Sequence, residues 1–207
     1  KFLISRRRMY WQVYLHKTVV AAEFLLINVL RRAKELISQG EELYTTPTLR
    51  IFLNNSFTPQ DFQKNIMVDG KKVLNWYTLL DDNDILISIK EWQTHNDPVL
   101  SKLAASLINR KLLHTQLNDK PLSKKAKEKF LKRIREMVIS DPELAKYFLI
   151  TGVITNSAYN KHDENIYVLN KDNSIKELNA ASDINLSALS KAVRKYFVCY
   201  PKELDIY

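Results

Sequence analysis

No glycine or proline precedes Gly40 in this chain. Apolar side chains such as Val20, Phe24 and Ile37 recur ahead of it at helical spacing. Residues 2–38 are therefore expected to form one continuous helix that ends at Gly40, because glycine favours the backbone conformation that closes a helix. Such a helix would be about 55 Å long, which exceeds most helices of globular proteins.

Four polar side chains follow one another on this helix at spacings of four, four and three: Arg6, Tyr10, Tyr14 and Lys17. An α-helix turns by about 100° per residue, so the four fall within a sector of about 80°. A guanidinium, two phenols and an ammonium aligned in this way can bind a polyanion. The alternative is a solvated basic face with tyrosines that pack between helices.

The charge balance favours anionic partners. The chain has 32 Lys and Arg against 23 Asp and Glu, which gives a net charge of +9. Residues 120–136 hold eight of the basic residues against Glu128 and Glu136. This cluster is typical of a solvated helix face, and a nucleic-acid surface is the second interpretation.

The single cysteine, Cys199, excludes a disulfide within the chain and any metal site built from several cysteines. It lies in an apolar run and is expected to be a buried structural thiol. One thiol also indicates a reducing, cytoplasmic location. No apolar run reaches the roughly 20 residues that a membrane-spanning helix needs, so no membrane partner is expected.

No complete catalytic motif is present. His162 and Asp163 are adjacent, but the polar stretch 160–165 around them predicts a hairpin loop rather than a metal site. The three glycines do not form a phosphate-binding loop. The chain is therefore either a binding module or part of an enzyme whose reacting centre lies elsewhere.

The remaining pattern predicts a mainly α (α+β) fold. A helical part is expected over residues 1–148, and a small α+β subdomain with an antiparallel sheet over 149–207, packed on the same core. The expected shorter helices cover residues 47–53, 82–93, 98–109, 121–140 and one or two turns from Asp141-Pro142, with Met137 among the inward side chains. The expected strands cover 149–159, 165–169, 174–178 and 196–200, with turns at Asp69-Gly70 and 171–174, a helix over 183–195 and a short strand within 111–117.

Several motifs together resemble a known family. Arg6, Tyr14, His16 and Lys17, on a long helix, resemble the segment that follows the metal-binding core in HD-domain dNTP triphosphohydrolases. This group includes the SAM- and HD-domain dNTPase of animal cells and bacterial relatives. The resemblance continues through Leu79–Asp84, Asp97–Leu100, Asn109–Leu112, Thr151-Gly152, Asn156–Tyr159, Ser187–Lys191 and Tyr196–Lys202.

The resemblance implies hydrolysis of a dNTP to a deoxynucleoside and triphosphate with a divalent metal ion. In the family, a His, a His-Asp pair and a later Asp hold the metal, upstream of the opening helix. None of these ligands is matched here. The chain thus resembles the C-terminal portion of such an enzyme, and we expect it to contain no metal ligand and to be inactive alone.

The resemblance assigns the substrate side of the helix. Arg6 matches the arginine that contacts the substrate triphosphate, and Tyr14 matches the tyrosine that lies against the deoxyribose. Tyr10 occupies a position where relatives have a histidine of the catalytic site.

A second group of residues resembles the contacts of a regulatory nucleotide. His16 and Lys17 match residues that touch its phosphates at a subunit interface, and Arg110 matches another. The implied partners are a deoxynucleotide substrate, a regulatory nucleotide and further copies of the chain. The rival interpretation is a basic helical module that binds nucleic acid or only oligomerises.

Overall fold

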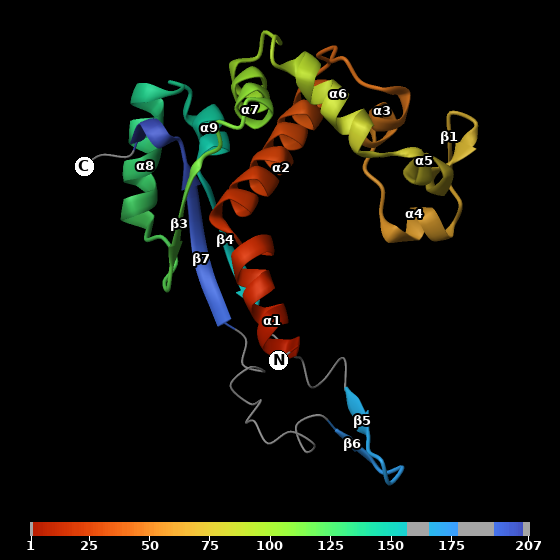
Figure 1. Ribbon diagram of the computed structural model, residues 1–207. Coiled ribbons are helices and arrows are strands. Elements are labelled where there is room, and N and C mark those ends of the chain that lie inside the picture. The colour runs from red at the N-terminus through yellow and green to blue at the C-terminus, as the bar shows by residue number, and fades with distance from the viewer. Residues whose placement is uncertain (1, 157–165, 178–192, 205–207) are drawn as a thin grey trace.

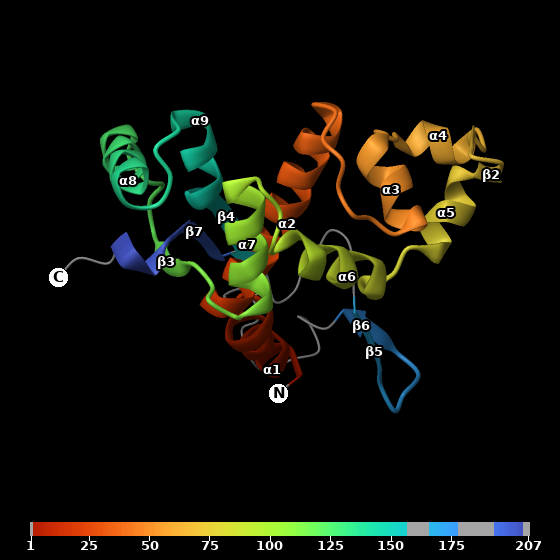
Figure 2. The same ribbon diagram turned by 90° about the horizontal axis from the view of Figure 1, so that it is seen from above.

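The chain folds into a mainly helical structure with small antiparallel sheets, as the sequence predicts. The computed structural model describes residues 2–156, 166–177 and 193–204. Helix α2 lies at the centre, helices α3 to α6 extend to one side, and the largest sheet with α8 lies on the other (Figure 1, Figure 2). The α-helices are α1 (Phe2–Met9), α2 (Lys17–Ser38), α3 (Pro47–Asn54), α4 (Pro59–Gln63), α5 (Val73–Leu79), α6 (Asp82–Trp92), α7 (Pro98–Ile108), α8 (Lys124–Met137) and α9 (Pro142–Ala145).

The prediction of one continuous helix over residues 2–38 is wrong. α1 runs into a π-helical turn, η1 (Tyr10–Tyr14), and α2 begins anew after Leu15 and His16. The helical segments on the two sides of this break are bent by 54° relative to each other.

The break has a local cause that does not need glycine or proline. His16 has an extended backbone (φ −63°, ψ 140°), and its Nδ1 accepts a hydrogen bond of 3.3 Å from the backbone N–H of Thr18. The side chain therefore caps α2 and satisfies a donor that a continuous helix would bond internally. The wider π-helical turn before it, closed by the 2.7 Å bond from Leu15 N–H to the Tyr10 carbonyl, ends the first segment.

The core forms where α2 packs against α7. Both helices carry small and branched apolar side chains on the contacting face, at spacings of three and four. Each fully buried leucine or valine contributes about 1.5–3 kcal/mol. The buried apolar residues are Val20, Ala21, Leu25, Val29, Ala33 and Leu36 on α2, and Val99, Leu100, Leu103 and Ala104 on α7.

A buried ion pair fixes α2 against the start of α7. Arg32 is 6% exposed and donates two hydrogen bonds to Asp97, from Nε to Oδ1 at 3.1 Å and from Nη2 to Oδ2 at 2.7 Å. Asp97 also caps α7, because it accepts the N–H of Leu100 at 2.7 Å. Burial opposes ionisation of Asp97, but Arg32 and the Leu100 N–H hold its pKa below the usual range.

Glu35 and Tyr147 extend this network to the 3₁₀ turn η2 (Lys146–Phe148). Arg32 Nη1 and the Tyr147 hydroxyl both donate to Oε2 of Glu35. Hydrogen bonds from Tyr147 and Arg32 lower the pKa of Glu35 against the effect of burial. Burial and the bond to Glu35 raise the pKa of Tyr147 to about 12. Asn28 adds a 2.8 Å bond to the Tyr147 carbonyl, so three elements meet at one polar cluster.

The lobe of helices α3 to α6 includes a short hairpin. Strands β1 (Met67–Val68) and β2 (Lys71–Lys72) pair in antiparallel register. The predicted turn between them is confirmed: Asp69 and Gly70 have φ of 46° and 76°, the left-handed values that a two-residue hairpin turn requires.

The largest sheet is antiparallel with strand order β3-β7-β4, so β7 is central. Thr115 of β3 and Ile150 of β4 both pair with Cys199 of β7, whose thiol is buried as predicted. The sheet thus combines a strand from the predicted helical part with two from the C-terminal part. Its strands are β3 (His114–Asn118), β4 (Ile150–Asn156) and β7 (Val193–Tyr200), followed by a 3₁₀ turn, η3 (Lys202–Leu204).

Three further sequence predictions have definite outcomes. Residues 193–195 were expected to end a helix but form the start of β7, because they pair with the end of β4; residues 183–192 lie outside the described residues. The predicted 171–174 turn is confirmed between β5 (Tyr167–Leu169) and β6 (Ile175–Glu177). Met137, expected to point inward on α8, is 54% exposed in the helix's last turn.

No single helix among the described residues is both long enough and apolar enough to cross a membrane. The bent pair Ile4–Tyr14 and Lys17–Ser38, taken together, has the length and composition of such a helix.

Candidate functional site

The three predicted substrate residues form one continuous side-chain cluster on α1 and η1. The Arg6 guanidinium carbon lies 5.8 Å from the centre of the Tyr10 ring, within cation–π range. The rings of Tyr10 and Tyr14 follow with centroids 5.2 Å apart and a tilt of 52°. Tyr14 is 53% exposed, whereas Arg6 and Tyr10 are half-buried. The cluster therefore presents one cation and an aromatic surface to solvent.

Lys17 does not continue this face. The 80° sector assumed an unbroken helix, and the break at Leu15 and His16 places Lys17 in the first turn of α2. The bend lies between the predicted substrate residues, which are on α1 and η1, and the predicted regulatory residues His16 and Lys17.

Lys17 and Arg110, 93 positions apart in the sequence, line the same hollow of about 280 Å³. We call this the Lys17 hollow. His114, Thr115 and Lys202 also line it, so three cationic side chains and an imidazole surround it. His16 is exposed and is not among the lining residues. The structure thus brings together two of the three predicted regulatory residues.

Arg110 is held in place by the end of α7. Its φ of 55° is left-handed, which is uncommon for a residue with a side chain. The conformation closes the helix, because Arg110 N–H bonds to Leu107 O at 3.2 Å and Lys111 N–H to Ser106 O at 2.8 Å. Arg110 therefore projects from the point where α7 turns toward β3.

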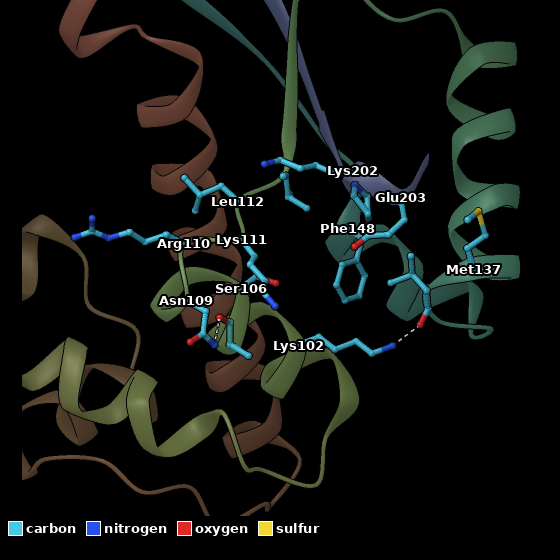
Figure 3. Close-up of a pocket in the computed structure, with 14 residues that line it drawn as sticks. Lys102, Ser106, Asn109, Arg110, Lys111, Leu112, Met137, Phe148, Lys202 and Glu203 are labelled. Atoms are coloured by element: carbon cyan, nitrogen blue, oxygen red, sulfur yellow. Dashed lines mark hydrogen bonds between the residues drawn. The ribbon is translucent and has the colours of Figure 1, made fainter. Parts of the chain in front are cut away.

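A larger cavity of about 590 Å³ adjoins the Lys17 hollow and shares Arg110 and Lys202 with it (Figure 3). Lys102 and Lys111 add positive charge at its edge, and Glu203 adds the one carboxylate. Lys102 Nζ donates a 2.5 Å bond to the Val138 carbonyl at the end of α8. In Figure 3 the Arg110 side chain points away from the other labelled cations. Apolar residues also line the cavity: Leu112, Leu113, Met137, Phe148 and Pro201.

Sequence reasoning missed Lys102, Lys111 and Lys202 as members of this basic region. Lys111 follows Arg110 directly, and Lys202 ends the motif Tyr196–Lys202 that carried the family resemblance, so both had a local signal. Lys102 had none, because a lysine on an exposed helical position is ordinary.

A metal centre is not found in the described part of the chain. No three His, Cys, Asp or Glu side chains there lie close enough together to hold a metal ion. His162 and Asp163 lie outside the described residues.

Comparison with known proteins gives the reaction class of a structural neighbour. No protein-family model matches the chain. It is 29% identical over 210 residues to the uncharacterized protein YwfO of Bacillus subtilis, covering 98% of this chain and 44% of YwfO. It is 42% identical to a phosphohydrolase of Bacteroides thetaiotaomicron of known crystal structure, with a TM-score of 0.86 over 96% of this chain and 48% of the other. The chain therefore spans about half the length of the proteins it matches, and nearly all of it resembles part of a phosphohydrolase.

Proposed function

We propose that this chain is part of an HD-type, metal-dependent phosphohydrolase that hydrolyses dNTPs to deoxynucleosides and triphosphate. The observation that carries the proposal is the continuous cluster of Arg6, Tyr10 and Tyr14 on α1 and η1. The likeness to a phosphohydrolase of known structure supports the reaction class. The motif resemblance supports the dNTP substrate.

The chemistry of each side chain suits a separate part of the substrate. The Arg6 guanidinium can donate two parallel hydrogen bonds to phosphate oxygens and stabilise the charge that builds up on the triphosphate while water attacks its α-phosphorus and the bond to the deoxynucleoside 5′-oxygen breaks. The exposed Tyr14 ring offers a flat apolar surface and a hydroxyl to the deoxyribose. Tyr10 lies between them and supports Arg6 through its ring face.

The divalent metal ion would polarise the phosphate and activate water. No group of three or more His, Cys, Asp or Glu side chains among the described residues could hold it. We propose that its ligands lie on a segment of the full-length enzyme that packs on α1 and η1. Ile4, Met9 and Val13 are exposed there, at 39%, 43% and 53%, and suit such an apolar contact. The chain alone is then inactive.

The Lys17 hollow suits the phosphates of a regulatory nucleotide. Lys17, Arg110 and Lys202 line it, and phosphate oxygens bind such cations through charge-assisted hydrogen bonds. We place His16, next to Lys17, at the edge of this site. A site of this kind between copies of the chain would make the enzyme a homo-oligomer.

The substrate assignment is tested with the full-length protein, a dNTP and a divalent metal, by measuring the release of triphosphate. Arg6→Ala should lower kcat/KM by about 100- to 1,000-fold, as expected for loss of a group that stabilises transition-state charge. Arg8→Ala is the matched control, because Arg8 is exposed and lies about 200° around α1 from Arg6. Equal rates for Arg6→Ala and wild type, or equal losses in both variants, would exclude this role of Arg6.

A further inference from the structure

Helix α8 concentrates the positive charge of the chain. Its seven Lys and Arg and two Glu leave a net charge of +5, more than half of the +9 of the whole chain. Its five lysines and Arg135 are exposed, and Arg133 is half-buried. Among the described residues, these cations form one ion pair, between Lys132 and Glu136, at a distance of 4.0 Å. An exposed ion pair of this length is weak.

The apolar side of the same helix is already occupied. Ile134 is fully buried, and the Phe130 ring packs on Tyr200 of β7 with centroids 4.7 Å apart. Helix α8 lies at the outer edge of the molecule in both views (Figure 1, Figure 2), and its lysines are exposed there. An amphipathic helix that lies on a lipid surface inserts its apolar side, and in α8 that side is not available.

Two hollows meet along α8. The first is an open groove on the outer side, lined by Lys125, Lys129, Lys132, Arg135 and Glu128. The second, of about 280 Å³, lies between α8 and the edge of the sheet, where Phe130, Arg133, Gln116 and Tyr200 line it. The two share Ala126 and Lys129, so a row of ammonium groups passes directly beside an aromatic hollow.

We propose that α8 and the adjoining edge of β3 bind single-stranded nucleic acid. Phosphates bind along Lys125, Lys129 and Lys132, and one base enters the hollow against the Phe130 ring. Proteins that bind single strands without sequence preference combine these two features, a basic groove and an aromatic surface. A duplex keeps its bases stacked and paired, so a base can enter the hollow only from a single strand. At about 21 Å, α8 spans a few nucleotides.

The experiment measures binding of a fluorescent 15-nucleotide oligothymidylate to the full-length protein by anisotropy over a range of salt concentrations. The triple variant Lys125→Gln, Lys129→Gln and Lys132→Gln should flatten the slope of log K against log salt by about 2, because each lost phosphate contact on a single strand contributes about 0.7. If the triple variant does not fold, Lys129→Gln alone should flatten the slope by about 0.7.

The matched control is Lys64→Gln, Lys72→Gln and Lys90→Gln, which removes the same charge from exposed positions on the opposite lobe. This control should leave the slope unchanged. The wild type should bind the single strand at least about tenfold more tightly than a duplex of the same length. Equal losses in both triple variants, equal affinity for duplex, or binding to anionic lipid vesicles without binding to the oligonucleotide would each overturn the proposal.

Discussion

At the scale of single residues, Gly152 leaves room for an aromatic ring from the neighbouring strand. It lies in β4 opposite Phe197 of β7, and a Cβ at this position would lie 2.5 Å from a ring carbon. The Phe197 ring cannot easily move away, because it is 2% exposed and packs on Phe24 of α2 with centroids 4.6 Å apart. Glycine is therefore required by packing rather than by backbone conformation.

Gly152→Ala should destabilise the protein by about 1–3 kcal/mol, the usual cost of forcing an extra methyl group into a packed site. The midpoint of urea unfolding measures the change. Thr151→Ala, at an exposed neighbouring position of the same strand, should cost less than about 1 kcal/mol. Phe197→Leu should partly rescue Gly152→Ala in a double-mutant cycle. A loss in Gly152→Ala that Phe197→Leu does not reduce would mean that the ring is not the obstacle.

At the scale of elements, the break between η1 and α2 divides the N-terminal segment into two parts that point in different directions. The Arg6–Tyr14 cluster lies before the break, and Lys17 lies after it, where it lines the same hollow as Arg110 from the end of α7. In a continuous helix, Lys17 would lie on the same face as the Arg6–Tyr14 cluster. Because of the bend, Lys17 at the start of α2 lines the hollow, whereas the Arg6–Tyr14 cluster lies outside it on α1 and η1.

Lys17→Gln should therefore alter regulation rather than the substrate site. In the full-length enzyme, the concentration of nucleotide needed for half-maximal activation should rise by about 10- to 100-fold, the loss expected for one hydrogen bond to a charged group. The rate without activating nucleotide should stay the same. Lys90→Gln, at an exposed position on α6, serves as the control. An unchanged activation curve for Lys17→Gln would argue against the proposed use of the hollow.

At the scale of the whole molecule, the features that could be predicted from the sequence are those that depend on residues close together in the chain. Asp97 before Pro98 and Asp141 before Pro142 mark helix starts because a cap acts within three residues. The break at His16 was missed because its signal is a histidine cap, which no glycine or proline accompanies. The family resemblance grouped Lys17 with Arg110, but Lys202 was missed, because tertiary packing alone places it in the lining of the same hollow.

The Arg32 network makes the stability of the whole molecule depend on pH, because it joins α2, α7 and η2. The pKa values of Asp97 and Glu35 are lower in the folded protein than the roughly 3.9 and 4.3 of free side chains. The unfolded chain thus binds protons first as the pH falls. The stabilisation is complete above about pH 5 and is lost as the pH drops through the folded pKa values.

Urea midpoints measured from pH 7 to pH 3 should fall steeply below about pH 4 in the wild type. Asp97→Asn should cost up to about 3–5 kcal/mol at pH 7, because it removes the buried carboxylate that pairs with Arg32 through two hydrogen bonds and leaves the partly exposed Glu35 to balance the guanidinium. Its midpoint should then vary less with pH over the acidic range. Asp119→Asn is the matched control: Asp119 pairs with Lys195 at 2.5 Å but is 82% exposed, so its loss should cost less than about 1 kcal/mol. Equal costs at the two sites would show that burial of Arg32 does not determine the stability of this network.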